Sequence, residues 1–194
     1  MHVDTFGVVL FLHIAVALTA FAMAGVAHAS LQAVARATTV AEARPWARAM
    51  HRIEPLFPVA ALALLGLGSW LVHLGAKTDD HFSFKDGWVL TAIIALVVIE
   101  AAGGMILAPN GKKLNKLILD APDGPVTPEI RAAAKYAPVW YAAHATTFGF
   151  VGVVFLMAAK PSGAWAPLIV GIGIIVGVLL SNWQLRSLPA TSDC

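Results

Sequence analysis

The chain has 194 residues, of which 59% are hydrophobic and only 12% are charged, and its net charge is +2 at pH 7. A soluble domain carries about twice this share of charged residues, so the composition excludes an ordinary soluble domain. The basic residues form no continuous patch, so no nucleic-acid partner is expected. The single cysteine, Cys194, excludes an internal disulfide and a thiolate metal cluster within one chain.

Apolar residues come in blocks of about 20, the length that crosses a hydrocarbon layer of about 30 Å. In chain order, the sequence predicts membrane-spanning helices over about 6–34, 55–76, 88–108, 129–160 and 165–186. No Lys or Arg precedes the first block, and it is longer than a signal-peptide core, so we expect a span. The predicted fold is all-α: a polytopic membrane protein with a single transmembrane domain over residues 1–194, built as a four-helix transmembrane bundle plus a fifth transmembrane helix.

The loops differ in their basic residues. The first and third loops and the C-terminal tail hold Arg36, Arg44, Arg48, Arg52, Lys112, Lys113, Lys116, Arg131, Lys135 and Arg186, and the opposite side holds Lys77, Lys85 and Lys160. Basic loops stay in the cytoplasm, so we expect the N-terminus outside and the C-terminus inside a bacterial cytoplasmic (inner) membrane.

Local signals mark the ends of two predicted helices. The segment 109–111, Pro-Asn-Gly, is a turn former and is expected to follow the third helix. Thr127 is predicted to cap the fourth helix, with Pro128 at its first position and Glu129 in its first turn.

Ionisable side chains inside apolar blocks are the candidate functional residues. Each costs about 2.5–3.5 kcal/mol at a helix centre, so such groups normally face a partner, water or a cofactor. His13 and His73 are predicted in the outer half, where they could face each other across the first two helices. The alternatives are an interhelical hydrogen bond for His13 and an interfacial position for His73 beside Trp70. His2 and His81 are expected at the surface.

A second polar group is predicted nearer the cytoplasm. At a rise of about 1.5 Å per residue, Glu100 and His144 share a depth, and His28, His51 and Glu54 lie at the inner edge. Glu100 could instead be a protonated carboxyl group bonded to the backbone. His144 could belong to the core, and the edge residues could be solvated.

Small residues favour close helix packing. Gly173 and Gly177 give the fifth span a contact face, which could serve another membrane subunit or a second copy in a homo-oligomer. Gly103 and Gly104 follow Glu100 and are a weak sign of a broken helix.

The segment 10–16, Leu-Phe-Leu-His-Ile-Ala-Val, resembles the opening helix of a broad group of small bacterial membrane proteins. The group includes the copper-resistance D proteins, the HemJ-type protoporphyrinogen oxidases and a family of predicted integral membrane proteins of unknown function. The resemblance is closest to that last family and covers roughly residues 5–163. Segments 86–90, 127–131 and 155–161 contribute to it.

The resemblance to the HemJ group implies a haem b held partly by His13. That group also uses a lysine in a later span, and no membrane-embedded lysine is found here. The resemblance to the copper-resistance group implies copper handling at the outer side, but its methionine-rich signature is missing.

Three functions fit these patterns. The first is a haem-binding redox or electron-transfer protein with axial histidines, His13 with His73 outside and His144 with His28 or His51 inside. The second is transport of copper, another divalent metal or protons along Glu100, His144 and His13, which a broken helix would favour. The third is an accessory subunit of a larger membrane complex. The sequence leaves open whether the chain is an enzyme.

Overall fold

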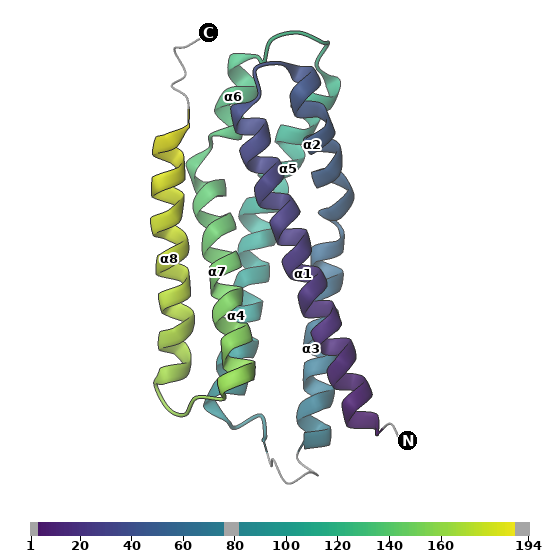
Figure 1. Cartoon of the computed structure of the whole chain (residues 1–194), viewed down its shortest axis with the longest axis vertical. Coiled ribbons are helices and arrows are strands. Elements are labelled where there is room, and N and C mark those ends of the chain that lie inside the picture. The colour runs from purple at the N-terminus through teal and green to yellow at the C-terminus, as the bar shows by residue number, and fades with distance from the viewer. Residues whose placement is uncertain (1–3, 76–81, 189–194) are drawn as a thin grey trace.

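The computed structural model describes residues 4–75 and 82–188, which form helices joined by short connections (Figure 1). The elements are α1 (Thr5–Arg36), α2 (Val40–Ile53), α3 (Leu56–Gly75), α4 (Gly87–Ala102), the π-helical η1 (Gly103–Leu107), α5 (Ala108–Asp120), α6 (Pro128–Ala134), α7 (Ala137–Ala159) and α8 (Trp165–Ser187). Within the described residues, five helical segments are long and apolar enough to cross a membrane. The expectations for His2, Lys77, His81 and Cys194 concern residues outside these ranges.

The starts of two helices have simple local causes. The Thr127 side chain accepts a hydrogen bond from the Ile130 amide, and Pro128 opens α6, which confirms the predicted cap. At α2, the side chain of Thr39 accepts from the Glu42 amide while the Glu42 carboxylate accepts from the Thr39 amide. This reciprocal capping box satisfies donors that a helix start leaves unpaired.

The turn predicted at residues 109–111 is wrong. Pro109 instead lies in the first turn of α5, where the missing N–H of a proline is tolerated. The Asn110 side chain donates to the Ile106 carbonyl at 2.7 Å. Consequently α4, η1 and α5 follow one another without a loop, from residue 87 to residue 120.

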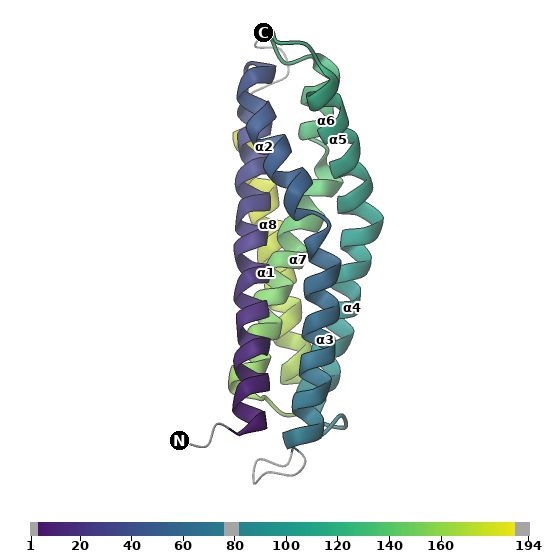
Figure 2. The same cartoon turned by 90° about the vertical axis from the view of Figure 1, so that its right-hand side faces the viewer.

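The helices pack as two groups side by side. α1 packs along α2 and α3, and α4 packs along α7, whose other side is covered by α8 (Figures 1 and 2). Figure 2 shows α2 and α3 in succession, with a bend between them, in the space between α1 and α4–α5. Contacts between the two groups are sparse along α3 and α4.

At one end of the molecule, two connections far apart in sequence are joined. Thr39 and Pro125 form an isolated antiparallel bridge, with the Val40 amide donating to the Gly124 carbonyl at 2.9 Å. An ion pair of 2.6 Å between Arg44 and Asp123 lies beside it. We call this end the bridged end. The side chains of Val34, Ala43, Ile118, Ile130 and Trp140 form a buried core beneath it.

The opposite end, which we call the Phe82 end, is held by aromatic packing. The Phe82 ring lies against Gly75, 6.3 Å from the centre of the Phe6 ring and 5.7 Å from that of Trp88. The Lys160 ammonium group lies 5.0 Å from the centre of the same ring, a cation–π contact.

Gly173 and Gly177 serve packing within the chain. A Cβ atom on Gly177 would lie 2.5 Å from the His144 carbonyl oxygen, and one on Gly173 would overlap the Phe148 carbonyl. The prediction that they form a close-contact face is confirmed. Within the chain this face is occupied by α7, and the contact with another membrane subunit or a second copy stays a prediction.

Candidate functional site: a cavity between the helix groups

A cavity of about 580 Å³ lies between α1, α2, α3, α4, η1, α5 and α7. This volume is typical of small-molecule sites, about 300–1,000 Å³. The walls are mostly apolar and come from Ala20, Ala24, Ala27, Leu64, Leu96 and Phe150 among others. The small side chains of α1 therefore leave part of the space between the two helix groups unfilled.

The cavity is closed toward the Phe82 end and open on one side. Phe150 of α7 lines this closed part of the cavity and packs on Phe21 of α1, with ring centres 4.8 Å apart. The exposed lining residues are Trp46, His51, Pro55 and Pro58 on α2, α3 and their junction, and Gly104 and Lys112 on η1 and α5. The opening therefore lies between these two pairs of elements, on the flank of the molecule.

His28 is the histidine that α1 places on the cavity wall away from its mouth. Its Nε2 atom forms a 2.9 Å hydrogen bond with the Thr147 hydroxyl of α7. Its ring also meets that of His144 edge to face, with centres 4.4 Å apart. The imidazole is therefore held on two sides by α7.

His144 lies behind His28 and does not line the cavity. It is only 3% exposed, and its Nδ1 atom lies 2.9 Å from the Trp140 carbonyl oxygen. A carbonyl only accepts, so this nitrogen carries the hydrogen. The ring also stacks on the Trp140 indole, with ring centres 6.0 Å apart. These contacts make His144 a positioning residue for His28.

Two carboxylates line the cavity from different elements. Glu100 lies near the end of α4, just before η1, and no group in the described part of the chain pairs with its carboxylate. Glu54 lies at the α2–α3 junction, and its buried Oε1 atom has no hydrogen-bond partner among the described residues. Charged groups thus face a space with apolar walls.

Buried polar atoms without partners gather on the same cavity. Ser30 is 1% exposed and Asn115 is 6% exposed. The Ser30 Oγ and Asn115 Nδ2 atoms, like Glu54 Oε1, have no hydrogen-bond partner within residues 4–75 and 82–188. Buried polar atoms are normally bonded, and each exception needs an explanation such as a ligand or water. Three of the four such atoms in that part of the chain belong to residues that line this cavity.

Two irregular backbone segments border the cavity. In η1, the α-helical pattern gives way to a π-turn at Gly103–Leu107, and Gly103, Gly104 and Leu107 line the space. Across from it, Pro55 separates α2 from α3 and cannot donate a backbone hydrogen bond. π-turns occur frequently at functional sites. The broken helix that Gly103 and Gly104 weakly indicated is not present, because the chain stays helical from α4 through η1 into α5.

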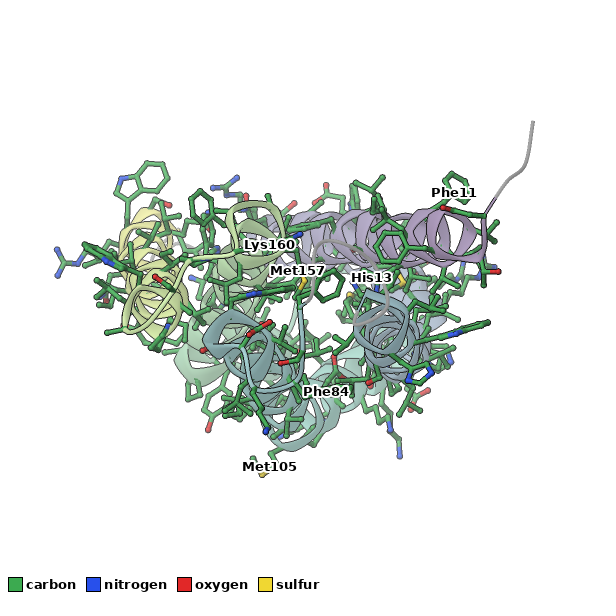
Figure 3. The ribbon with its side chains drawn as sticks, turned by 90° about the horizontal axis from the view of Figure 1, so that it is seen from below. Phe11, His13, Phe84, Met105, Met157 and Lys160 are labelled. Atoms are coloured by element: carbon green, nitrogen blue, oxygen red, sulfur yellow. The ribbon has the colours of Figure 1, made fainter. Side chains whose placement is uncertain are left out.

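The predicted outer histidines belong elsewhere. The His13 ring packs on α3 at Gly68, where an added Cβ would lie 3.2 Å from its Cε1 atom, and its Nδ1 atom is buried without a described partner. Figure 3 shows His13 on the inner side of α1, whereas Phe11 points outward. His73 follows Gly68 by five residues, so it points about 140° away around α3, and it is exposed. The predicted face-to-face outer pair is therefore wrong.

The predicted inner pair does not fit two axial haem ligands. Imidazole nitrogens on opposite sides of one metal ion lie about 4 Å apart, because each bond is about 2 Å, and the ring centres lie further apart still. The centres of the His28 and His144 rings are only 4.4 Å apart in an edge contact. Across the described residues, His13, His73, His144 and Glu100 form no cluster of three or more metal-ligating side chains.

Comparison of the chain with known protein families, curated proteins and solved structures found no match. The resemblance to the copper-resistance D and HemJ-type groups thus stays a prediction from the sequence.

Sequence reasoning found His28, Glu54 and Glu100 but gave no weight to Ser30 and Asn115. The two lie on α1 and α5, more than 80 positions apart in the printed sequence. A polar residue in an apolar helical stretch was the only signal for Ser30, and Asn115 lies between lysines typical of a solvated loop.

Proposed function

We propose that this chain is an integral membrane protein that binds a lipophilic small molecule in the cavity between its helix groups. In this proposal, α1, α3, α4 and α7 form a four-helix transmembrane bundle, and α8 is a fifth span. The bridged end, which carries most of the basic residues, faces the cytoplasm of a bacterial cell.

The observation that carries the proposal is the apolar cavity with convergent polar atoms. Its volume of about 580 Å³ accommodates a molecule of cofactor or lipid-fragment size. An apolar wall binds the body of such a ligand, and a few fixed polar groups orient it. The hydrogen-bonded His28 and Thr147 pair supplies one such group.

The side opening supports a ligand that enters from the bilayer. The exposed rim at Pro55, Pro58 and Gly104 lies next to apolar helices that are long enough to span a membrane. A ligand dissolved in lipid reaches this opening without crossing water.

A cavity-filling variant tests the proposal. Gly103 lines the cavity, and a Cβ there meets no atom within 4 Å, so Gly103→Leu places a side chain in the space. Gly171 on α8 is equally open but does not line the cavity, which makes Gly171→Leu the matched control. The measurement is saturable binding of a neutral, polarity-sensitive fluorophore to purified protein in nanodiscs. We expect Gly103→Leu to reduce binding and Gly171→Leu to leave it unchanged. Equal binding by all three proteins would refute the proposal.

Haem b is one occupant to test, and it would give the protein a redox role. His28 borders the cavity and is the imidazole that would bind the iron, through the ring nitrogen that is not bonded to Thr147, while Lys112 at the mouth would meet a propionate. Haem b carries two propionates against the carboxylates of Glu54 and Glu100, so haem and a cationic ligand are alternative occupants of this cavity. When bound, haem supplies one-electron chemistry. We expect a Soret band at about 400–430 nm if haem is the ligand, lost in His28→Ala and retained in the exposed His73→Ala control. A protein produced with ample haem that shows no such band does not bind haem.

Transport is a second candidate, favoured by the interruption between α2 and α3 at Pro55. Discontinuous helices at a binding site are typical of transporters. Uptake of the bound molecule into proteoliposomes, slowed by Glu100→Gln, would distinguish transport from binding alone. Binding without uptake would exclude it.

A further inference from the structure

The charges that face the cavity restrict which lipophilic molecule it takes, and this step rests on the proposed function. The ionisable side chains that line the cavity are His28, His51, Glu54, Glu100 and Lys112. With neutral histidines, two carboxylates stand against one ammonium group. An anionic ligand would therefore meet net repulsion.

The two carboxylates are not equivalent. Lys112 is close enough to Glu54 for its charge to act on that carboxylate. Among the described residues, no ion pair holds the Glu100 carboxylate, and Glu100 lies in α4, separated from the bridged end by η1 and α5. Glu100 is therefore the uncompensated charge of the cavity.

From this arrangement, we infer that the cavity binds a lipophilic cation, a monovalent organic cation with an apolar body, whose charge lies beside the Glu100 carboxylate. In a space with apolar walls, a charge interaction is stronger than in water because the effective dielectric constant is lower. A cation compensates Glu100, while its apolar groups fill the space between Ala24, Leu96 and Phe150.

Ser30 and Asn115 provide an independent indication of a ligand. Both are more than nine-tenths buried, and each has a side-chain atom with no partner in the described part of the chain. They line the cavity from α1 and α5, toward the bridged end. A polar substituent at the end of the ligand away from Glu100 would satisfy them.

Aromatic side chains on the cavity suit the same ligand class. Trp46 and Phe150 both contribute to the lining. An organic cation is attracted to the face of an aromatic ring, most strongly to tryptophan. Trp46 also reports binding, because quenching or a shift of its fluorescence follows a change in its surroundings.

Two probes of the same shape and opposite charge test the inference. Tetraphenylphosphonium is the cation and tetraphenylborate the anion, and binding of each is measured by calorimetry on the full chain in nanodiscs of uncharged lipid. We expect saturable binding of the phosphonium and none of the borate. Glu100→Gln is expected to weaken phosphonium binding by about tenfold or more. Glu100→Asp, which keeps the charge, is expected to retain most of it.

Matched controls separate the charge effect from misfolding. Glu129→Gln removes an exposed carboxylate that does not line the cavity, and we expect phosphonium binding to be unchanged. The neutral fluorophore should bind Glu100→Gln as it binds the unchanged protein, which shows that the cavity is intact.

The outcomes distinguish this inference from the function on which it rests. If the fluorophore binds and is excluded by Gly103→Leu, but both probes bind equally well or Glu100→Gln has no effect, the cation inference is wrong and the cavity proposal stands. If neither the fluorophore nor either of the two probes binds, the cation inference and the cavity proposal are both wrong.

Discussion

The rings of His28 in α1 and His144 in α7 meet edge to face, with their centres 4.4 Å apart. One side of this contact is fixed by the Trp140 carbonyl, which binds His144 Nδ1, and the other by the Thr147 hydroxyl, which binds His28 Nε2. The pair joins the α1–α3 group to the α4–α7 group beside the cavity. These contacts fix the position of the His28 imidazole on the cavity wall, where a ligand would meet it.

Thr147→Val should release His28 from α7. Valine keeps the volume of threonine but cannot form the 2.9 Å hydrogen bond to His28. We expect a loss of about 1 kcal/mol in unfolding free energy, measured by thermal or denaturant unfolding in detergent, together with altered fluorophore affinity. In the control, Thr19→Val, the lost hydroxyl bonds only to the Ala15 carbonyl of its own helix. Equal effects of the two variants on fluorophore affinity would argue against a positioning role for Thr147.

Gly177→Ala should force α7 and α8 apart. The added Cβ would lie 2.5 Å from the His144 carbonyl oxygen, which is backbone and cannot move alone. Overpacking of this kind costs about 1–3 kcal/mol of unfolding free energy. At Gly171, where nothing lies within 4 Å of the added atom, alanine should be neutral or stabilise by up to about 1 kcal/mol. The unfolding free energies of the two variants are measured in the same way and compared. If Gly177→Ala were as stable as the unchanged protein, α7 and α8 would not pack this closely.

Arg44→Ala should destabilise the bridged end more than Asp123→Asn. Arg44 donates to Asp123 at 2.6 Å and also to the Ala121 carbonyl at 2.8 Å. The carboxylate of Asp123 is largely exposed, with 75% of the side chain accessible, so its loss should cost at most about 1 kcal/mol. Hydrogen exchange of the Val40 and Val126 amides, which bond across the bridge, reports the difference. Faster exchange in Asp123→Asn than in Arg44→Ala would contradict this ordering.

Orientation in the membrane can be measured by cysteine labelling. In a Cys194→Ser background, a cysteine replaces Asp123 at the bridged end or Lys85 near the Phe82 end. A membrane-impermeant maleimide added to intact cells should label Lys85→Cys and should label Asp123→Cys only after permeabilisation. The opposite pattern would place the basic loops outside and overturn the proposed topology.

Much of the fold follows from sequence alone. The positions of the apolar blocks predicted the five long helical segments, because a helix that crosses a membrane needs about 20 apolar residues. The Thr127 cap and the contact face at Gly173 and Gly177 were also predictable, since both depend on neighbours close in sequence. The turn expected at residues 109–111 failed because the preceding π-turn and the Asn110 side chain let the helix continue.

The partners of polar side chains were not predictable. Depth estimates correctly placed His28 and His144 in the same half of the molecule. They could not tell that the rings touch, because contact depends on the rotation of each helix about its own axis. For the same reason His13 and His73 were expected to meet, but His13 packs on the face of α3 that contains Gly68, and His73 points about 140° away from that face.

The amino-acid sequence by itself determined that this protein is a set of long apolar helices with a few ionisable groups inside them. Local hydrophobicity and helix capping depend on residues close together in the sequence, so they can be predicted without knowing the tertiary contacts. Only the tertiary structure decided that small residues on α1 leave a cavity, and that Ser30, Glu54, Glu100 and Asn115 line it. That outcome depends on how side chains from four separate segments fill, or fail to fill, a shared space.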